Sequence, residues 1–364
     1  MAPATTAARD AARAARREAA LALRPTMTPT GPAPDRLRLA TWNLNSLRQR
    51  LPAVERFVER TRPDVLCLQE TKAAELSVVA AEAFDRLGYG IVHVGDGPYN
   101  GVAVASPHPI EDVAVSGALG DEHLDREPRM VTCTVHGPEA VRVASVYVPH
   151  GREVDHWHYH YKLAFLEALT AQCRCWLAGG GHVVVAGDLN VAATDDDVFH
   201  PAPFEGATHV TEPERNALRR LLDTGLVDVD VAAWGPRARR FTWWNHGIGY
   251  PRNLGMRLDV IAVDTALAQR LDTTWIDHLE RGTRPASDHA ALLADFHLAT
   301  RSDPAAHAAG VTAGTASSPH AVTSTAGSSE PSSFGAGASR VPPSSSSADR
   351  KATPCGSSGH SSSV

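Results

Sequence analysis

Apolar and polar residues alternate in two different patterns along the central part of the chain, one typical of strands and one typical of helices. Short apolar runs between turn residues are typical of buried strands, and apolar residues recurring about every three to four positions are typical of helices. The pattern predicts strands at 37–42, 65–69, 102–106, 130–136, 141–148, 182–186, 241–244, 258–263, 273–278 and 290–297. It predicts helices at 46–60, at 157–177 and from about Thr211, where Thr211 and Glu214 form a capping box. This mixture indicates a layered α/β or α+β fold, with the strands between 102 and 148 arranged as a meander.

Composition divides the 364 residues into three parts. Residues 36–298 have the composition and length of one large α/β domain. Residues 299–364 are rich in Ser, Ala, Gly, Thr and Pro with one aromatic residue, Phe334, so we expect a disordered tail whose partners are unknown. Residues 1–35 are rich in Ala, Arg and Pro, and we expect them to be disordered or marginally helical. The start codon could encode Met1 or Met27, and the Arg-rich part of this segment could also be a DNA-contacting arm or a transit peptide.

Several classes of protein are disfavoured by the same composition. No apolar run approaches the roughly 18 residues of a membrane span, so we expect no membrane association. The five cysteines are scattered without the paired spacing of a zinc site, which favours a reducing compartment. The formal net charge of -6 argues against binding nucleic acid through bulk positive charge, although a local basic groove stays possible.

Polar side chains follow the predicted strands at several points. They are Asn43, Asn45, Glu70, Asp188, Asn190, Asp259, Asp288 and His289. A carboxylate at the end of a buried strand is costly unless it is paired, hydrogen-bonded or bound to a metal. Each of these residues alone has an ordinary structural explanation, such as a Glu70–Lys72 ion pair, but several together indicate a site. Asp259 is the natural partner to orient the His289 imidazole.

Oxygen ligands from Glu, Asp and Asn without thiolates favour a hard cation, Mg2+ or Mn2+ as its substitute. Such an ion binds phosphate well and polarises it. The chain has no Gly-rich loop of the kind that cradles a nucleoside triphosphate. The residues therefore favour hydrolysis of a phosphate ester by metal-activated water.

Seven motifs, in order along the chain, resemble the exonuclease III family of apurinic/apyrimidinic endonucleases, and the resemblance spans about 36–298. They are Thr41–Arg50 (TWNLNSLRQR), Leu68–Lys72 (LQETK), Tyr147–Gly151 (YVPHG), Gly187–Asn190 (GDLN), Phe241–Trp244 (FTWW), Met256–Asp259 (MRLD) and Ser287–His289 (SDH). The resemblance implies the endonuclease/exonuclease/phosphatase fold, a four-layered α/β sandwich with two mixed sheets flanked by helices.

The resemblance also implies a role for each matching residue. Glu70 would be the main Mg2+ ligand with Asn43 beside it, and Asp288 would complete the metal side. Asp188 would orient or deprotonate the attacking water, with Asn190 holding that water or a phosphate oxygen; both are also candidate metal ligands.

On the substrate side, the resemblance implies that His289, oriented by Asp259, donates to the scissile phosphate, and that Tyr147 contacts the phosphate. Trp243 and Met256 would line a pocket for a base-less sugar, and one of the adjacent Trp243 and Trp244 should face the core. The expected DNA-binding residues are Lys72, Asn45 and Arg48. His150, Asn245 and Ser46 differ from frequent family residues, and none of them replaces a proposed catalytic atom.

The leading hypothesis is a Mg2+-dependent DNA repair nuclease that incises 5′ to abasic sites in double-stranded DNA and removes 3′ blocking groups or nucleotides. One alternative within the fold is a phosphatase or phosphodiesterase acting on inositol phosphates or phospholipid head groups. Another is a binding module without catalysis, which has no need of the acid, amide and imidazole set. The Ala, Arg and Gly bias fits a bacterial protein, which we expect to be a cytoplasmic monomer associated with the chromosome.

Overall fold

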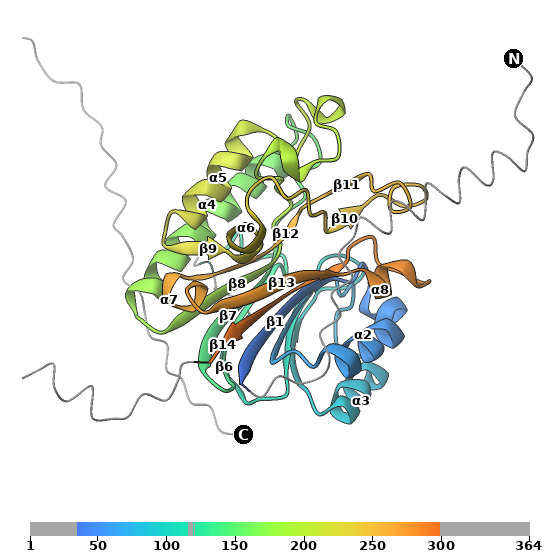
Figure 1. Cartoon of the computed structure of the whole chain (residues 1–364), viewed down its shortest axis with the longest axis vertical. Helices are drawn as coiled ribbons and strands as arrows, with labels where there is room; N and C mark the ends of the chain where they lie inside the picture. Colours follow the sequence, from blue (N-terminus) through green and yellow to red (C-terminus); the bar gives the residue numbers. More distant parts are fainter. Residues whose placement is uncertain (1–34, 116–118, 120, 299–364) are drawn as a thin grey trace, which may run out of the picture. The chain divides into compact units, whose positions relative to one another are not determined.

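Two six-stranded sheets packed face to face form the centre of the protein in the computed structural model, which describes residues 35–115, 119 and 121–298 (Figure 1). The first sheet has the order β13-β14-β1-β2-β4-β3 and the second the order β5-β6-β7-β8-β12-β9. The bounds in the first sheet are β1 Arg36–Asn43, β2 Val65–Gln69, β3 Gly90–Val94, β4 Val102–Ser106, β13 Leu271–Asp277 and β14 Ala291–His297. Those in the second are β5 Ile110–Ala114, β6 Met130–His136, β7 Ala140–Tyr147, β8 His182–Asp188, β9 Leu226–Asp228 and β12 Asp259–Asp264.

Helices cover the outer face of each sheet, and a two-stranded ribbon lies beside them (Figure 1). The main helices are α2 Leu47–Thr61, α3 Val78–Leu87, α4 Trp157–Ala178 and α5 Glu212–Leu222. Shorter elements are α6 Val229–Trp234, α7 Thr265–Ala268, α8 His278–Gly282 and the 3-10 turns Asp195–Asp197 and Ala202–Phe204. The ribbon pairs β10 Trp243–Trp244 with β11 Gly255–Met256. The predicted four-layered α/β sandwich is therefore confirmed.

Alternation of side chains explains why the central strands are mostly apolar. In β1, Leu37 and Leu39 pack between the sheets, whereas Ala40 and Trp42 pack under α2. Because successive side chains point to opposite faces, a strand covered on both sides is rich in apolar residues, and a buried polar residue such as Arg38 pairs with a partner, here Asp295. Burying one large side chain such as Phe57 of α2, which is fully buried, contributes about 1.5–3 kcal/mol.

Parallel pairs place the ends of neighbouring strands together. β1 runs parallel to β2 and β7 runs parallel to β8, while the other strand pairs within the sheets are antiparallel. Both sheets are thus mixed, as expected. The carboxyl ends of β1, β2, β7 and β8 then meet at one edge of the sandwich, where loops can collect polar side chains.

The predicted elements agree with the structure to within a few residues, with one topological correction. The strands at 102–106, 130–136 and 141–148 do not form one meander, because β4 joins the first sheet and β6 and β7 join the second. A strand was expected over 241–244, but only Trp243 and Trp244 pair, since the ribbon is two residues long. The sequence pattern did not predict α3, β3 and β5, nor the short elements β9, β11, α6, α7 and α8.

The expected N-terminal extension and C-terminal tail lie outside the described residues, as does the separate unit Thr300–Val364. Within the described part of the chain, no helix combines the length and apolar character that crossing a membrane requires.

Candidate active site

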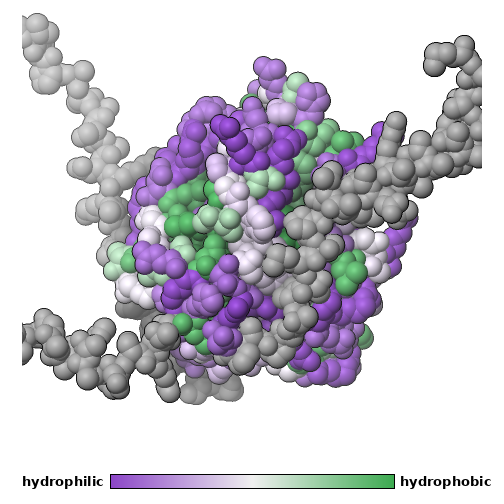
Figure 2. All heavy atoms as spheres, viewed as in Figure 1, coloured by the Kyte–Doolittle hydropathy of each residue, from purple (hydrophilic) through white to green (hydrophobic). Residues whose placement is uncertain are grey.

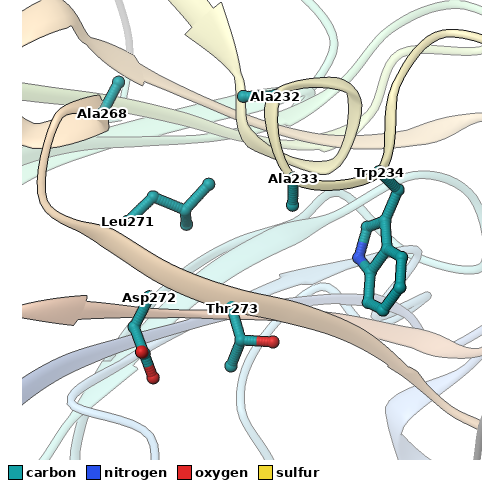
Figure 3. Close-up of a pocket in the computed structure, with 7 residues that line it drawn as sticks. All are labelled: Ala232, Ala233, Trp234, Ala268, Leu271, Asp272 and Thr273. Atoms are coloured by element: carbon teal, nitrogen blue, oxygen red, sulfur yellow. The ribbon is translucent and has the colours of Figure 1, made fainter.

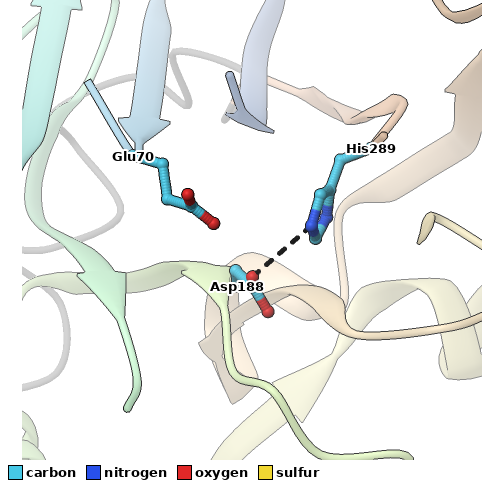
Figure 4. Close-up of side chains that lie close together, drawn as sticks. All are labelled: Glu70, Asp188 and His289. Atoms are coloured by element: carbon cyan, nitrogen blue, oxygen red, sulfur yellow. Dashed lines mark ion pairs between the residues drawn. The ribbon is translucent and has the colours of Figure 1, made fainter. Parts of the chain in front are cut away.

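Three ionisable side chains from different strand ends face one another at the edge of the sandwich (Figure 4). Glu70 follows β2, Asp188 ends β8, and His289 precedes β14. One ligand atom from each lies within 4.8 Å of the others. The structure therefore brings together residues that are 101 to 219 positions apart in sequence.

The loops that present these groups hold an unusual backbone conformation. Asn45, Glu70, Lys72 and Asn190 all have φ between 49° and 52°, in the left-handed region that non-glycine residues seldom adopt. Ser46 has φ 105°. Backbone strain persists only where surrounding contacts impose it, and it concentrates at functional sites. Here the amide of Ser46 donates to the Glu70 carbonyl at 2.7 Å, tying the two loops together.

Asn43 joins the two carboxylates. Its Nδ2 donates to Glu70 Oε1 and to Asp188 Oδ2, each at 2.9 Å, and the residue is fully buried. The Lys72 ammonium lies 2.8 Å from Glu70 Oε2. Burial disfavours a charged Glu70, but Lys72 outweighs that effect, followed by the hydrogen bond from Asn43, so the pKa of Glu70 lies below its ordinary value. Glu70 is therefore a carboxylate at neutral pH.

The predicted pairing of His289 with Asp259 is present in the geometry. His289 Nδ1 lies 2.8 Å from Asp259 Oδ2, and Nε2 lies 3.7 Å from Asp188 Oδ2. Burial opposes the charged imidazole, but Asp259 and then Asp188 outweigh it and raise the pKa of His289 to about 10. Burial also raises the pKa of the Asp188 carboxyl, while the neighbouring His289 lowers it. The proton of this pair consequently belongs on His289, whose Nε2–H points toward the cluster.

Asp188 is fixed from its own loop as well. The amide of Asn190 donates to Asp188 Oδ1 at 2.9 Å, and Asn190 Nδ2 donates to the Val148 carbonyl at 2.9 Å. A Cβ atom on Gly187 would lie 1.9 Å from the Val146 carbonyl oxygen, so only glycine allows β7 and β8 to approach this closely.

Tyr147 stands at the end of β7 with its hydroxyl toward the same acids. Desolvation of the phenol raises its pKa well above the ordinary value, and the charges of Glu70 and Asp188 raise it further. The Arg129 guanidinium lies 5.0 Å from the centre of the Tyr147 ring. A neutral Tyr147 hydroxyl is therefore available as a hydrogen-bond donor throughout the neutral range.

The oxygen-rich cluster suits a small hard cation. Glu70 and Asp188 supply carboxylate oxygens and Asn43 an amide, and within the described residues no cysteine belongs to the cluster. A protonated His289 cannot serve as a ligand, because both ring nitrogens then carry protons. The donor set of this chain thus fits Mg2+ or Mn2+ at Glu70 better than a zinc ion.

Comparisons with known proteins identify the family. The family model described as "Endonuclease/Exonuclease/phosphatase family" matches residues 40–289. The chain belongs to this family. The Bacillus subtilis exodeoxyribonuclease is 29% identical over 263 residues, which are 70% of this chain and 98% of that protein. The structure of an AP endonuclease from Archaeoglobus fulgidus has a TM-score of 0.67 and 34% identity, covering 72% of this chain and 100% of its own.

A 3′ phosphatase from Neisseria, solved with a product DNA hairpin, is equally similar, with a TM-score of 0.67, 34% identity and coverage of 71% of this chain and 99% of that one. Members of the Endonuclease/Exonuclease/phosphatase family with these similarities are hydrolases, and this chain fits the group that resembles exonuclease III.

Other residues expected at the site of this family member lie around the cluster. Asp288 is not part of the Glu70–Asp188–His289 cluster in the described residues; its Oδ1 accepts from Asn45 Nδ2 at 2.9 Å and its Oδ2 from Trp243 Nε1 at 3.2 Å. Lys72 Nζ donates to Asn45 Oδ1 at 2.6 Å, which links this group back to Glu70. An unbroken line of polar contacts therefore runs from the acidic cluster to Trp243.

Of the remaining expected residues, some are buried in the core and others lie at the surface. Trp244 is buried while Trp243 is half-buried, so the expected alternation of the two is confirmed. Met256 is buried directly opposite Trp243 in the ribbon, and the two side chains pack in one apolar cluster. Arg48 is exposed on the first turn of α2.

Two residues that shape the site, Ser287 and Arg129, could not be identified from the sequence. Ser287 Oγ donates to the Asn43 carbonyl at 2.7 Å and accepts from the His289 amide at 3.1 Å, so it ties the His289 loop to β1. Arg129 lies under Tyr147 as a buried cation after a run of polar residues. A lone Ser or Arg beside a strand has many structural uses, so neither could be singled out without the fold.

A hollow lies away from these groups, between α6, α7 and the start of β13 (Figure 3). Its volume is about 380 Å³, and Figure 2 shows hydrophobic surface over α6 and α7. Its lining residues are Ala232, Ala233, Trp234, Ala268, Leu271, Asp272 and Thr273. The one carboxylate among them, Asp272, pairs with Arg36, so the hollow lacks the converging polar groups of a catalytic site.

Proposed function

We propose that this protein is a Mg2+-dependent DNA nuclease that incises duplex DNA 5′ to abasic sites and removes 3′ blocking groups or nucleotides. The observation that supports it most is the cluster of Glu70, Asp188 and His289, with Asp259 behind the imidazole. A carboxylate for a metal, a second for water and a fixed cation for phosphate are the parts that phosphoester hydrolysis needs. The family membership agrees with this chemistry.

The residues divide the reaction between them. Asp188, held by the Asn190 amide and by Asn43, would orient the attacking water and accept its proton. The water oxygen forms a bond to phosphorus, the bond from phosphorus to the leaving oxygen breaks, and that oxygen acquires a proton. His289, as an imidazolium, would donate to a non-bridging phosphate oxygen as charge grows there.

Glu70 and Asn43 would hold Mg2+. Asn190 is a further candidate ligand, and so is Asp288, although its oxygens bond Asn45 and Trp243 outside the cluster. The ion would supply charge stabilisation on the phosphate and the leaving oxygen. Tyr147, neutral and at the rim, would donate to a phosphate oxygen. These assignments follow the sequence-based expectation and are proposals for this chain.

On the substrate side, the DNA backbone would be contacted by Lys72, Asn45 and Arg48. The pocket for the flipped sugar would be lined by Trp243 and Met256. Because the chain has a net charge of -6, DNA binding depends on such local groups and not on bulk charge. We infer a monomer working on the chromosome of a bacterial cell.

A second candidate is a 3′-end-processing enzyme with little internal incision. The observation that favours it is the similarity to the Neisseria 3′ phosphatase, which equals the similarity to the AP endonuclease. Both candidates use the same cluster and differ only in the DNA that reaches it.

A panel of substrates in Mg2+ separates these functions. We would compare a duplex with one abasic analogue, a nicked duplex ending in a 3′ phosphate, an intact duplex and a soluble inositol phosphate. Cleavage 5′ to the analogue together with 3′ phosphate release supports the proposal. Release of the 3′ phosphate alone supports the second candidate. Phosphate release from the inositol phosphate alone would contradict both and favour the small-molecule alternative.

A further inference from the structure

Asn190 is hydrogen-bonded through its backbone amide, its side chain and its backbone carbonyl. Its N–H donates to Asp188 Oδ1 at 2.9 Å, and its side-chain Nδ2 donates to the Val148 carbonyl. Its carbonyl oxygen accepts two hydrogen bonds of 2.6 Å, one from Lys162 Nζ and one from His209 Nδ1. Asn190 itself has φ 52°, which this set of bonds maintains. The residue whose amide orients Asp188 is therefore fixed at its carbonyl by Lys162 and His209.

The Lys162 ammonium reaches Asn190 from the middle of a buried network. Lys162 Nζ lies 2.5 Å from Glu214 Oε1, and both side chains are 0% exposed. Glu214 Oε2 also accepts from the Thr211 amide, closing the capping box of α5. Removing one partner of a fully buried ion pair leaves an uncompensated charge, so the pair holds α4 and α5 in one arrangement. The Asn190 carbonyl is thus tied to the rigid helical layer behind the second sheet.

Hydrogen bonds define the protons on the two histidines in this network. The Arg152 amide donates to His150 Nδ1 at 3.0 Å, so a neutral His150 carries its proton on Nε2. His150 Nε2 lies 3.2 Å from His209 Nε2, which must accept because His209 Nδ1 donates to Asn190. The chain of bonds has one direction, from the Arg152 amide to the Asn190 carbonyl.

We propose that Lys162 and His209 are positioning residues, which act through the Asn190 backbone to hold the Asp188 carboxylate in its reactive orientation. This inference rests on the proposed function, because it assigns Asp188 to the water. Both residues bond the Asn190 carbonyl, and they act on Asp188 through the Asn190 backbone, whose amide donates to Asp188 Oδ1. Outer hydrogen-bond partners of this kind typically change activity about 10- to 100-fold.

Two substitutions of nearly equal shape separate positioning from packing. Asn at position 209 keeps a nitrogen donor where Nδ1 of the ring stands, whereas Leu of similar size has none. We expect His209→Leu to lower the single-turnover rate about 10- to 100-fold. We expect His209→Asn to stay within about threefold of wild type, and the duplex Kd measured in EDTA to be unchanged in both. The control is His182→Phe, because His182 begins β8 at the end opposite Asp188 and should leave the rate unchanged.

Wild-type rates in His209→Leu would overturn the proposal. Equal losses of rate in the Leu and Asn variants would also overturn it, because they would show a packing effect.

If His209→Leu does not fold, the double variant K162M/E214Q replaces it, since it removes the Lys162 donor without leaving a buried carboxylate charged. If the wild type cleaves none of the tested duplexes, the proposed function fails, and a crystal structure of His209→Leu decides this inference separately. An Asn190 amide still bonded to Asp188 Oδ1 at φ near 52° in that structure would overturn it; loss of that bond would support it.

Discussion

His289 Nδ1 lies 2.8 Å from Asp259 Oδ2 in a fully buried pair, and the opposite ring nitrogen faces Asp188 at 3.7 Å. Asp259 sits directly opposite Asp188 in the pairing of β12 with β8, so one sheet fixes both acids. The imidazole therefore has one orientation and one charge state at neutral pH.

Asp259→Asn should lower the turnover rate about 100-fold or more, because the ring loses the carboxylate that holds it charged and oriented. Single-turnover kinetics on an abasic or 3′-phosphate duplex checks this. Asp264→Asn is the matched control, since Asp264 ends the same strand and pairs with His182 at 3.1 Å, away from the cluster. Equal losses in the two variants would mean that the effect is on folding and not on His289.

The charge on His289 should also appear in the pH dependence of stability. Its pKa is raised from 6.5 to about 10, so its stabilisation is full below about pH 6.5 and is lost as pH rises through about 10. In metal-free protein we expect the stability advantage of wild type over His289→Asn to shrink steadily between pH 7.5 and 10. Urea unfolding at several pH values measures it, and an advantage that stays constant or grows over that range would contradict the assignment.

Glu70→Gln should remove the response to Mg2+. In wild type we expect Mg2+ to raise the melting temperature, because a ligand that binds only the folded state adds about 2.7 kcal/mol at 100 times its Kd. The variant should show little shift and little cleavage. Glu55→Gln on α2 is the control, as Glu55 pairs with Arg86 on the surface. A full Mg2+ shift in Glu70→Gln would place the metal elsewhere.

Deleting all residues after Leu298 should leave cleavage by the core within about twofold of the full chain. β14 is complete at His297, and the Leu298 amide already donates to the Asp35 carbonyl at 3.1 Å, so the sheet needs nothing further. Initial rates on a short duplex compare the two proteins. A loss of tenfold or more on that duplex would show that the tail takes part in catalysis or DNA binding.

The fold could be read from the sequence where one physical rule dominated. Strands covered on both faces, such as β2 and β8, are continuous apolar runs, and the Thr211 capping box marks the start of α5 with its side chains alone. The arrangement of β4, β6 and β7 could not be read this way, because an apolar run does not say which sheet a strand joins. α3 was not predicted, because its exposed apolar residues Val78 and Val79 interrupt the helical periodicity of apolar positions.

The site was predictable as a set of residues but not as a geometry. The pairing of Asp259 with His289 followed from chemistry, because a buried imidazole beside a carboxylate has few other partners. The place of Asp288, turned toward Asn45 and Trp243, depends on a loop conformation that no local pattern encodes. Lys162 and His209 lie 28 and 19 residues from Asn190, so their contact exists only in the folded chain.

The central claim is that the Asp188 cluster cleaves damaged DNA with a metal. The most direct measurement is incision of a labelled duplex with one abasic analogue and a 3′ phosphate, with Mg2+ or EDTA, by wild type and Asp188→Asn. We predict metal-dependent cleavage 5′ to the analogue and release of the 3′ phosphate by wild type, and neither by a folded Asp188→Asn. Equal activity of the two proteins, or cleavage of neither lesion by wild type in Mg2+ or Mn2+, would contradict the account.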